Sequence, residues 1–204
     1  MDQSVQYANF VHMPRAKEFD YEQKLTEARN LFWEKGYHAT SLQDIMDTMQ
    51  LNKSSIYDSF GGKHELFVKC LLDYASFKLR QYEQAGRKEA SPFKALEKTI
   101  KDVVDQTLKD NRSCLIVKSI FELAPTDNEV RKIITEKGVA LENILFQLLV
   151  KAKEQGEIRD NIQPRIAARY ILHTFSSFWS HYILSQNKKE VNEMVRFLID
   201  SLKV

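Results

Sequence analysis

Apolar residues recur along the chain with the period of an α-helix, and no stretch alternates strictly between polar and apolar positions. Leu25, Ala28 and Phe32, for example, lie at spacings of three and four and would share one helix face. Glycines, prolines and cap-forming residues interrupt the pattern. The pattern predicts an all-α protein of about nine helices, over residues 19–35, 41–49, 53–60, 63–84, 92–110, 113–123, 126–155, 164–185 and 191–202.

Helix-start signals support several of these segments. Thr40 and Gln43 have the spacing of a capping box, in which each side chain bonds the other residue's backbone N–H, and so do Thr126 and Glu129. Asn52 is a good N-cap residue for the third segment. Residues 1–18 have no helical period, and we expect them to form a flexible arm.

The composition restricts the class of protein. The 204 residues include only six glycines and four prolines, which argues against a loop-rich or all-β fold. No stretch approaches the roughly 18 uninterrupted apolar residues of a membrane helix, and the N-terminus lacks the compact apolar run of a signal peptide. Cys70 and Cys114 are too isolated for a disulfide framework or a zinc site. We therefore expect a cytoplasmic protein with no membrane contact, metal or cofactor.

The charge of the chain neither requires nor excludes a nucleic-acid partner. The formal net charge is +2, and residues 1–63 carry seven basic side chains against nine acidic ones. Affinity for DNA would therefore have to come from the positions of a few cations and not from overall charge.

Two short predicted helices, 41–49 and 53–60, follow one another across a tight turn, as in a helix-turn-helix. The second begins with small or flexible hydrogen-bonding residues and one cation, which suits a helix that enters the major groove. Amides at helix N-termini also attract phosphate. Thr40, Ser41 and Lys63 stand at the starts of neighbouring helices, where they could contact phosphates. We predict DNA contacts by these three residues and by Asn52, Lys53, Ser54 and Ser55.

Five motifs occur in register and without a gap over residues 21–67. They are Phe32-Trp33-Glu34-Lys35-Gly36-Tyr37, Thr40-Ser41, Ile45, Tyr57-Asp58-Ser59-Phe60 and Lys63-His64-Glu65-Leu66. Together they resemble the N-terminal region of the tetracycline-repressor (TetR) family. The resemblance implies a DNA-binding regulator and adds Tyr57, on the recognition helix, to the predicted DNA contacts.

The resemblance also implies the domain organisation. We expect an arm over 1–18, a three-helix DNA-binding domain over 19–65, and a larger helical effector-binding and dimerisation domain over 66–204. The chain departs from the family pattern at Gln50, where the turn usually has glycine, and at Asp58, which would repel phosphate.

The second half of the chain resembles the effector domain of one branch of the same family. The matching motifs are Cys114-Leu115-Ile116-Val117, Glu122-Leu123-Ala124 and Gln155-Gly156-Glu157-Ile158. In that fold the domain holds a small-molecule cavity, and its last two helices form a dimer surface. Candidate cavity residues, as aromatic or polar side chains in apolar surroundings, are Tyr74, Phe77, Phe121, Phe146, Tyr170, His173 and Phe178.

The segment 164–185 is apolar around much of its circumference, which predicts burial on more than one side. One side would meet the domain's own core and the other a second subunit, giving a four-helix contact with segment 191–202. The stripe that we assign to the homodimer surface consists of Ala168, Leu172, Phe175, Trp179, Tyr182, Val191, Val195, Leu198 and Leu202. An ordinary intramolecular core is the alternative.

Other classes of protein find less support in the sequence. The Glu-x-x-His pairs of di-metal helical bundles are absent, as are His-Glu-x-x-His and Gly-x-Gly-x-x-Gly motifs. We expect a non-enzymatic, ligand-responsive repressor that leaves a palindromic DNA operator when a hydrophobic or aromatic small molecule binds. A helical adaptor that binds protein and not DNA is the alternative. Cys114 would be either a thiol sensor for electrophiles or a small core residue.

Overall fold

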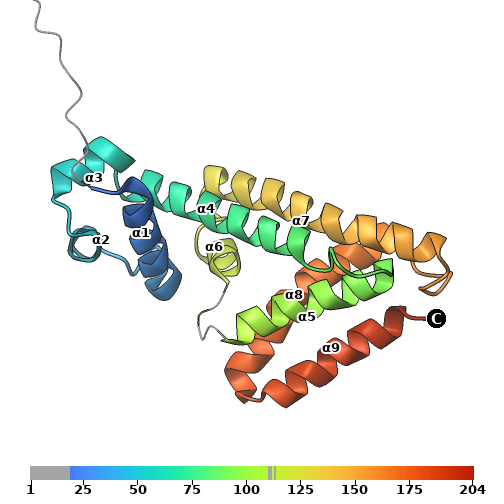
Figure 1. Ribbon diagram of the computed structural model, residues 1–204. Helices are drawn as coiled ribbons and strands as arrows, with labels where there is room; N and C mark the ends of the chain where they lie inside the picture. Colours follow the sequence, from blue (N-terminus) through green and yellow to red (C-terminus); the bar gives the residue numbers. More distant parts are fainter. Residues whose placement is uncertain (1–18, 110–111, 113) are drawn as a thin grey trace, which may run out of the picture.

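The computed structural model describes residues 19–109, 112 and 114–204. The described residues form nine helices and no strand, apart from one isolated bridge between Ile158 and Lys203 (Figure 1). The all-α prediction is thus confirmed, while the expected arm over 1–18 lies outside the described residues. The helices are α1 (Tyr21–Lys35), α2 (Leu42–Met49), α3 (Lys53–Phe60), α4 (Lys63–Gln84), α5 (Pro92–Lys109), α6 (Leu115–Glu122), α7 (Asn128–Glu154), α8 (Pro164–Ser185) and α9 (Lys188–Leu202).

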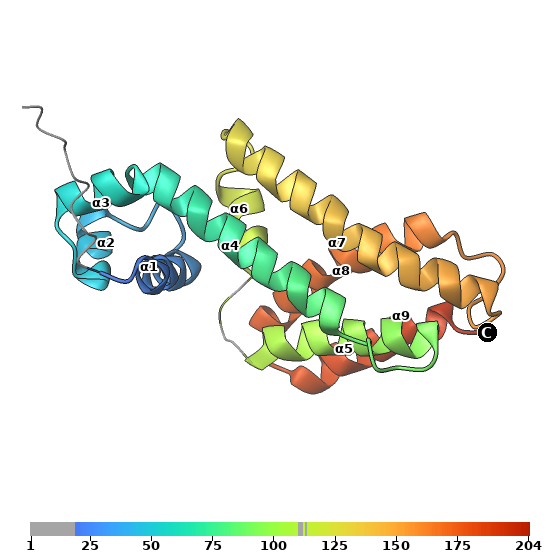
Figure 2. The same ribbon diagram turned by 45° about the horizontal axis from the view of Figure 1, so that its top comes forward.

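The helices enclose two hydrophobic cores. The N-terminal core joins α1, α2, α3 and the first half of α4, and it also takes Leu115 and Leu123 from the α6 region and Val130 from α7. The C-terminal core lies among α5, the second half of α7, α8 and α9. In Figures 1 and 2, α4 and α7 are the two long helices that run from one core to the other, and they pack against each other.

The helix α4 belongs to both cores. Leu66, Phe67, Leu71 and Tyr74 are buried in the N-terminal core, whereas Tyr82, two turns further on, is buried in the C-terminal core. The two cores therefore divide within α4, after the predicted domain boundary at 65/66.

Two of the predicted helix caps are wrong by one residue. The capping box of α2 is formed by Ser41 and Asp44, because the Thr40 hydroxyl instead donates to the carbonyl of Gly36 at 2.6 Å and is buried. The N-cap of α7 is Asp127, whose carboxylate accepts the N–H of Val130 at 3.0 Å. The Asn52 cap of α3 is confirmed.

The stripe that we assigned to the dimer surface lies in the interior of the single chain. α5, α7 and α9 pack against α8 and cover this stripe. Seven members of the stripe are buried in the C-terminal core, and two, Leu172 and Phe175, pack at its edge; the seven are Ala168, Trp179, Tyr182, Val191, Val195, Leu198 and Leu202. The prediction is corrected because helical periodicity shows that a helix has two apolar sides without showing which of them faces the protein's own core.

Candidate functional site

The helix-turn-helix consists of α2, a turn at Gln50, and α3. Ile45 and Met49 of α2 and Ile56 and Phe60 of α3 are buried in the N-terminal core, which fixes the two helices against α1 and α4. The opposite face of α3 is left at the surface. This arrangement presents the start of α3 outward on a rigid support, as major-groove insertion requires.

Most of the predicted base-reading residues gather on this outward face. Asn52, Lys53 and Ser54 are exposed, and the ring of Tyr57 has 48% of its surface exposed. The Lys53 ammonium lies 5.8 Å from the centre of the Tyr57 ring, so one cation and one aromatic hydroxyl stand side by side. The Asn52 carboxamide oxygen accepts the N–H of Ser55 and the hydroxyl of Ser54, both at 2.8 Å, and thereby orders the first turn.

The residues predicted to contact phosphate are in different situations. Thr40 is fully buried with its hydroxyl engaged, so its side chain cannot reach DNA. The Ser41 hydroxyl and amide both donate to the Asp44 carboxylate at 2.8 Å. The Lys35 ammonium bonds the same carboxylate at 2.7 Å and, with Ser41, holds the pKa of Asp44 well below its usual range. Lys63 is half-buried, with its ammonium 4.3 Å from the centre of the Tyr37 ring.

The turn between α2 and α3 contains a strained residue. Gln50 has φ 50° and ψ 42°, the left-handed region that disfavours side chains with a Cβ. This explains why glycine is usual at this position of the family pattern. The Gln50 side chain compensates in part by donating to the carbonyl of Asp47 at 2.5 Å.

Replacing Gln50 by glycine is expected to raise the free energy of unfolding by about 0.5–1 kcal/mol, because relief of the left-handed strain exceeds the added entropy of the unfolded chain. Chemical denaturation followed by circular dichroism measures the change. Gln43→Gly is the matched control, since it places glycine inside α2 and should destabilise by about 1 kcal/mol. A loss of stability in Gln50→Gly would contradict the strain interpretation.

Two side chains of helix α6 bond backbone groups at the end of α1 and in the turn that follows it. The Lys118 ammonium donates to the carbonyls of Trp33 and Glu34, each at 2.7 Å. The Glu122 carboxylate accepts the amides of Tyr37 at 3.0 Å and His38 at 2.6 Å. We call this set of four bonds the α6 clamp. The sequence shows Lys118 and Glu122 one helical turn apart, but not the backbone groups that they bind.

The absence of a side chain at Gly36 allows Glu122 to approach closely enough to form the α6 clamp. Gly36 has φ +85°, and a Cβ built there would lie 2.9 Å from an oxygen of the Glu122 carboxylate. A second link, between the start of α4 and the N-cap of α7, joins the imidazole of His64 to the carboxylate of Asp127 at 2.7 Å. The N–H of Val130 and the bond from His64 lower the pKa of Asp127. The DNA-binding helices are therefore tied by polar bonds to both α6 and α7.

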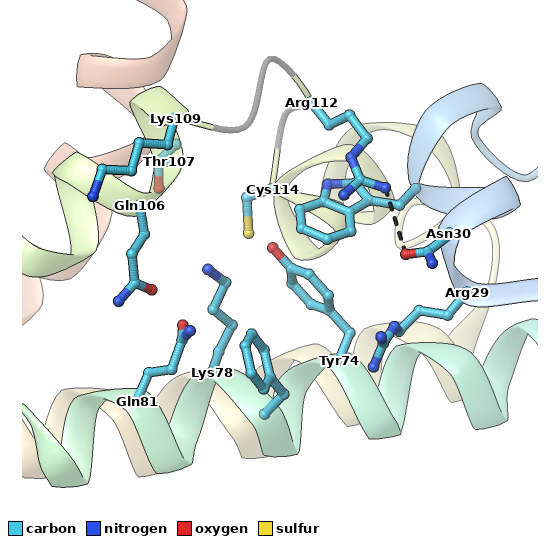
Figure 3. A pocket seen from close by; sticks show the side chains of 12 residues that line it. Arg29, Asn30, Tyr74, Lys78, Gln81, Gln106, Thr107, Lys109, Arg112 and Cys114 are labelled. Carbon is cyan, nitrogen blue, oxygen red and sulfur yellow. Dashed lines mark hydrogen bonds between the residues drawn. The ribbon is translucent and has the colours of Figure 1, made fainter. Parts of the chain in front are cut away.

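A cavity of about 610 Å³ lies where α1, α4 and α5 approach the start of α6 (Figure 3). Two of the seven predicted ligand residues, Tyr74 and Phe77, line it. The cavity volume lies within the range typical of small-molecule sites, roughly 300–1,000 Å³. Most of its wall consists of residues that the sequence did not indicate, because α1 and α5 are distant in the chain and meet only in the fold.

The other predicted ligand residues lie elsewhere. Tyr170 and Phe178 line a second hollow between α8 and α9. Phe121 has 79% of its surface exposed, and His173 is exposed as well, so neither is the apolar-pocket residue that we predicted. The guanidinium of Arg165 covers the ring of Phe146 and lies 3.7 Å from the ring centre. The seven predicted residues therefore do not form one site: two line the cavity beside α4, two line the hollow between α8 and α9, two are exposed, and Phe146 packs against the C-terminal core.

The outward side of α8 and α9 carries several large apolar side chains at the surface. Phe197 is 78% exposed and Leu184 85%, and Ile166, Tyr170 and Ile183 are each about half-exposed or more. Single exposed apolar residues are ordinary, whereas a group of them on two neighbouring helices is typical of contact surfaces. None of the helices described is both long enough and apolar enough to cross a membrane.

Comparisons with known proteins agree with this architecture. Bacterial regulatory proteins of the tetR family match residues 25–70, and the C-terminal region of YsiA-like proteins matches residues 76–202. An uncharacterized HTH-type transcriptional regulator of Bacillus subtilis (strain 168), YezE, is 30% identical over 170 residues, covering 78% of this chain and 84% of YezE. The HTH-type transcriptional repressor ComR of Escherichia coli (strain K12) is 29% identical over 147 residues, covering 71% of this chain and 70% of ComR.

Solved structures show the same fold. A cysteine-substituted form of the TetR family regulator CifR, in complex with a 26-bp double-strand operator DNA, has a TM-score of 0.80 at 17% identity, covering 93% of this chain and 100% of that chain. The first family match ends at residue 70 and the second begins at residue 76, both within α4, and together they span both cores. The chain therefore belongs to the TetR family of bacterial regulatory proteins and is a helix-turn-helix DNA-binding transcription regulator.

Proposed function

We propose that this regulator is a repressor, which binds a roughly palindromic operator as a homodimer and leaves it when a small molecule occupies the cavity beside α4. The observation that carries the proposal is the exposed start of α3, where Lys53 and Tyr57 project from a helix with a buried underside. The naming of ComR as a repressor and the operator complex of CifR support this function. The family does not favour the adaptor alternative. We also propose that the protein has no catalytic role and is cytoplasmic.

We propose DNA contacts by the residues that remain accessible at the surface. These are Ser41, Asn52, Lys53, Ser54, Ser55, Tyr57 and Lys63. Lys53 and Tyr57 would reach base edges or nearby phosphates in the major groove. Ser41 would act through the start of α2, where the helix dipole favours phosphate. Asp58, exposed one residue after Tyr57, would repel phosphate and therefore limits how deeply the end of α3 can enter.

We propose that the dimer forms through the exposed apolar side of α8 and α9 described above. Helices that leave apolar residues outward on one side can pair with the same surface of a second copy around a two-fold axis. Phe197 and Tyr170 would lie within this contact, near the hollow between the two helices. A two-fold dimer presents two α3 helices to DNA and so reads a palindrome.

The fold provides a direct connection from cavity to DNA. The cavity wall contains α1 residues of the N-terminal core and α4 residues, and α4 begins directly after the helix-turn-helix. A ligand that prefers a different angle between α1 and α4 would change the spacing of the two α3 helices in the dimer. Differential binding of roughly 1–3 kcal/mol is enough for such coupling.

Fluorescence anisotropy of the protein with duplexes tiling its own promoter region tests the function. We expect saturable binding to one near-palindromic duplex, with affinity that falls steeply as salt increases. Weak binding that is equal on every duplex, including duplexes from the genes next to it, would contradict sequence-specific regulation.

A separate prediction concerns the α6 clamp, in which Glu122 accepts the amides of Tyr37 and His38. In Glu122→Ala the amides of Tyr37 and His38 lose their acceptor and should exchange with solvent roughly ten-fold faster or more, since a hydrogen bond to a charged group contributes about 1.5–3 kcal/mol. Amide exchange followed by NMR measures this locally. Glu136→Ala, on the exposed side of α7, should leave both amides unchanged. Equal exchange in all three proteins would show that the clamp does not hold this turn in solution.

A further inference from the structure

The aspartates of the helix-turn-helix differ in what their carboxylates bind. Asp44 accepts both the hydroxyl and the amide of Ser41 at 2.8 Å. Asp47 accepts the carboxamide N–H of Gln43, one turn earlier on α2, at 2.8 Å. Asp58 is exposed, and its carboxylate has no hydrogen-bond or ion-pair partner among the described residues. A local structural role therefore accounts for the first two aspartates and not for Asp58.

The periodicity of α3 turns Asp58 directly away from the protein. Ile56 and Phe60 are buried in the N-terminal core, and a rotation of about 100° per residue places Asp58 about 160° from both of them. Ser54, one turn earlier, is exposed on the same side. In Figures 1 and 2, α2 and α3 lie at one end of the molecule, away from α5, α8 and α9. The Asp58 carboxylate therefore stands on the side of α3 that would face the floor of a major groove.

A carboxylate in this place needs a hydrogen-bond donor that the DNA backbone does not supply, because phosphates are negative as well. The only cation of α3 is Lys53, and its ammonium lies 5.8 Å from the centre of the Tyr57 ring. In the part of the chain that the structure describes, Lys53 forms no ion pair with Asp58. The donor must therefore come from the edge of a base.

The four bases differ in what they offer to a carboxylate, which accepts hydrogen bonds and donates none. In the major groove, guanine presents two acceptors, and thymine presents an acceptor and a methyl group. Adenine presents an amino donor beside an acceptor, whereas cytosine presents an amino donor alone. Cytosine is thus the base that can bind a carboxylate without also repelling it.

We propose that Asp58 determines the base specificity of this regulator, with its carboxylate accepting the N4 amino group of one cytosine in each half of the operator. This role rests on the proposed function, in which α3 enters the major groove of a roughly palindromic site. The negative charge opposes entry of α3 at other sequences and is compensated where the cytosine is present. Two-fold symmetry of the dimer gives two such cytosines, at equivalent positions of the two half-sites.

In vitro selection from duplexes with a randomised centre tests this role. We expect the unaltered protein to enrich a palindrome with a fixed cytosine in each half. Asp58→Ala should retain the rest of the palindrome and lose the preference at that position. Asp58→Asn should shift the preference toward adenine, because a carboxamide can bond N6 and N7 of adenine together. Asp47→Ala removes an exposed carboxylate of α2, and as the matched control it should enrich the same sequence as the unaltered protein.

Fluorescence anisotropy with defined duplexes measures the size of the effect. Replacing the cytosine–guanine pair of one half-site by thymine–adenine should weaken binding of the unaltered protein roughly ten-fold, and binding of Asp58→Ala by less than about two-fold. N4-methylcytosine still pairs with guanine but carries a methyl group in place of the groove-facing hydrogen of its amino group. It should weaken binding of the unaltered protein to a similar extent. This measurement needs no variant, so it decides the role of Asp58 even if a variant does not fold.

Two results overturn the role of Asp58. If Asp58→Ala binds every duplex more tightly by the same factor, the carboxylate is only a general repulsive charge. If N4-methylation of the selected cytosine leaves the affinity unchanged, its amino group is not the donor. Selection also separates this role from the regulatory function. Enrichment of no sequence by the unaltered protein would refute both, whereas a palindrome that Asp58→Ala enriches unchanged would refute the role of Asp58 alone.

Discussion

Replacing Lys53 and Tyr57 together by alanine is expected to weaken operator binding roughly 100-fold or more while leaving the fold unchanged. Each contact of this kind contributes about 1–3 kcal/mol, and a dimer loses both contacts in both half-sites. Neither side chain supports the N-terminal core, since Lys53 is exposed and Tyr57 is nearly half-exposed. Fluorescence anisotropy with the operator duplex measures the loss, and thermal unfolding verifies the fold.

The control for this pair is Lys94→Ala, which removes an equal charge far from α3. It should bind the operator within about two-fold of the unaltered chain, because a distant charge is screened by salt. The Lys53 and Tyr57 variant should also show a shallower dependence of affinity on salt, since fewer counterions are released per complex. Unchanged affinity in the double variant would show that another surface reads the DNA.

Replacing Phe197 by glutamate is expected to convert the dimer to a monomer and to abolish tight operator binding. Phe197 is 78% exposed in the single chain, so the change costs little within the protomer. In a two-fold contact the substitution, present in both subunits, would bury two carboxylates without partners. Buried unpaired charges cost several kcal/mol each. The dimer dissociation constant should rise at least roughly 1,000-fold, as measured by sedimentation velocity.

Phe121→Glu is a closely matched control for this variant. Phe121 is 79% exposed on α6, so the substitution has the same chemistry and nearly the same exposure outside α8 and α9. It should remain dimeric and bind the operator. The proposed dimer surface would be wrong if Phe197→Glu remained a dimer.

The helices and the helix-turn-helix could be predicted from the sequence because their signals are local. The spacing of Leu25, Ala28 and Phe32 and the cap at Asn52 depend only on residues within a few turns, and the structure has them as predicted. The cap of α2 was misplaced by one residue because Thr40 and Ser41 are both good cap residues. Which of the two hydroxyls turns inward depends on the carbonyl of Gly36, which sequence spacing does not show.

The candidate sites were less predictable because they depend on how distant helices meet. The stripe through Trp179 and Val195 is apolar on either interpretation, and only packing against α5 and α7 shows that it is core. Likewise Arg112, Lys78 and Trp33 look like ordinary surface or core residues in the sequence. They form one cavity wall only because α1, α4 and the start of α6 converge.

The division of the cores within α4 has a consequence for engineering. A chimera that joins this DNA-reading unit to another sensor at residue 65 would discard Leu66, Phe67, Leu71 and Tyr74, which fill the N-terminal core. It would also remove the α6 clamp and the His64–Asp127 pair, which come from the other side of the junction. A workable exchange would keep α4 through Tyr74 and bring α6 with it. The transferable unit of this regulator is therefore discontinuous in sequence, and it includes part of the sensor to which it responds.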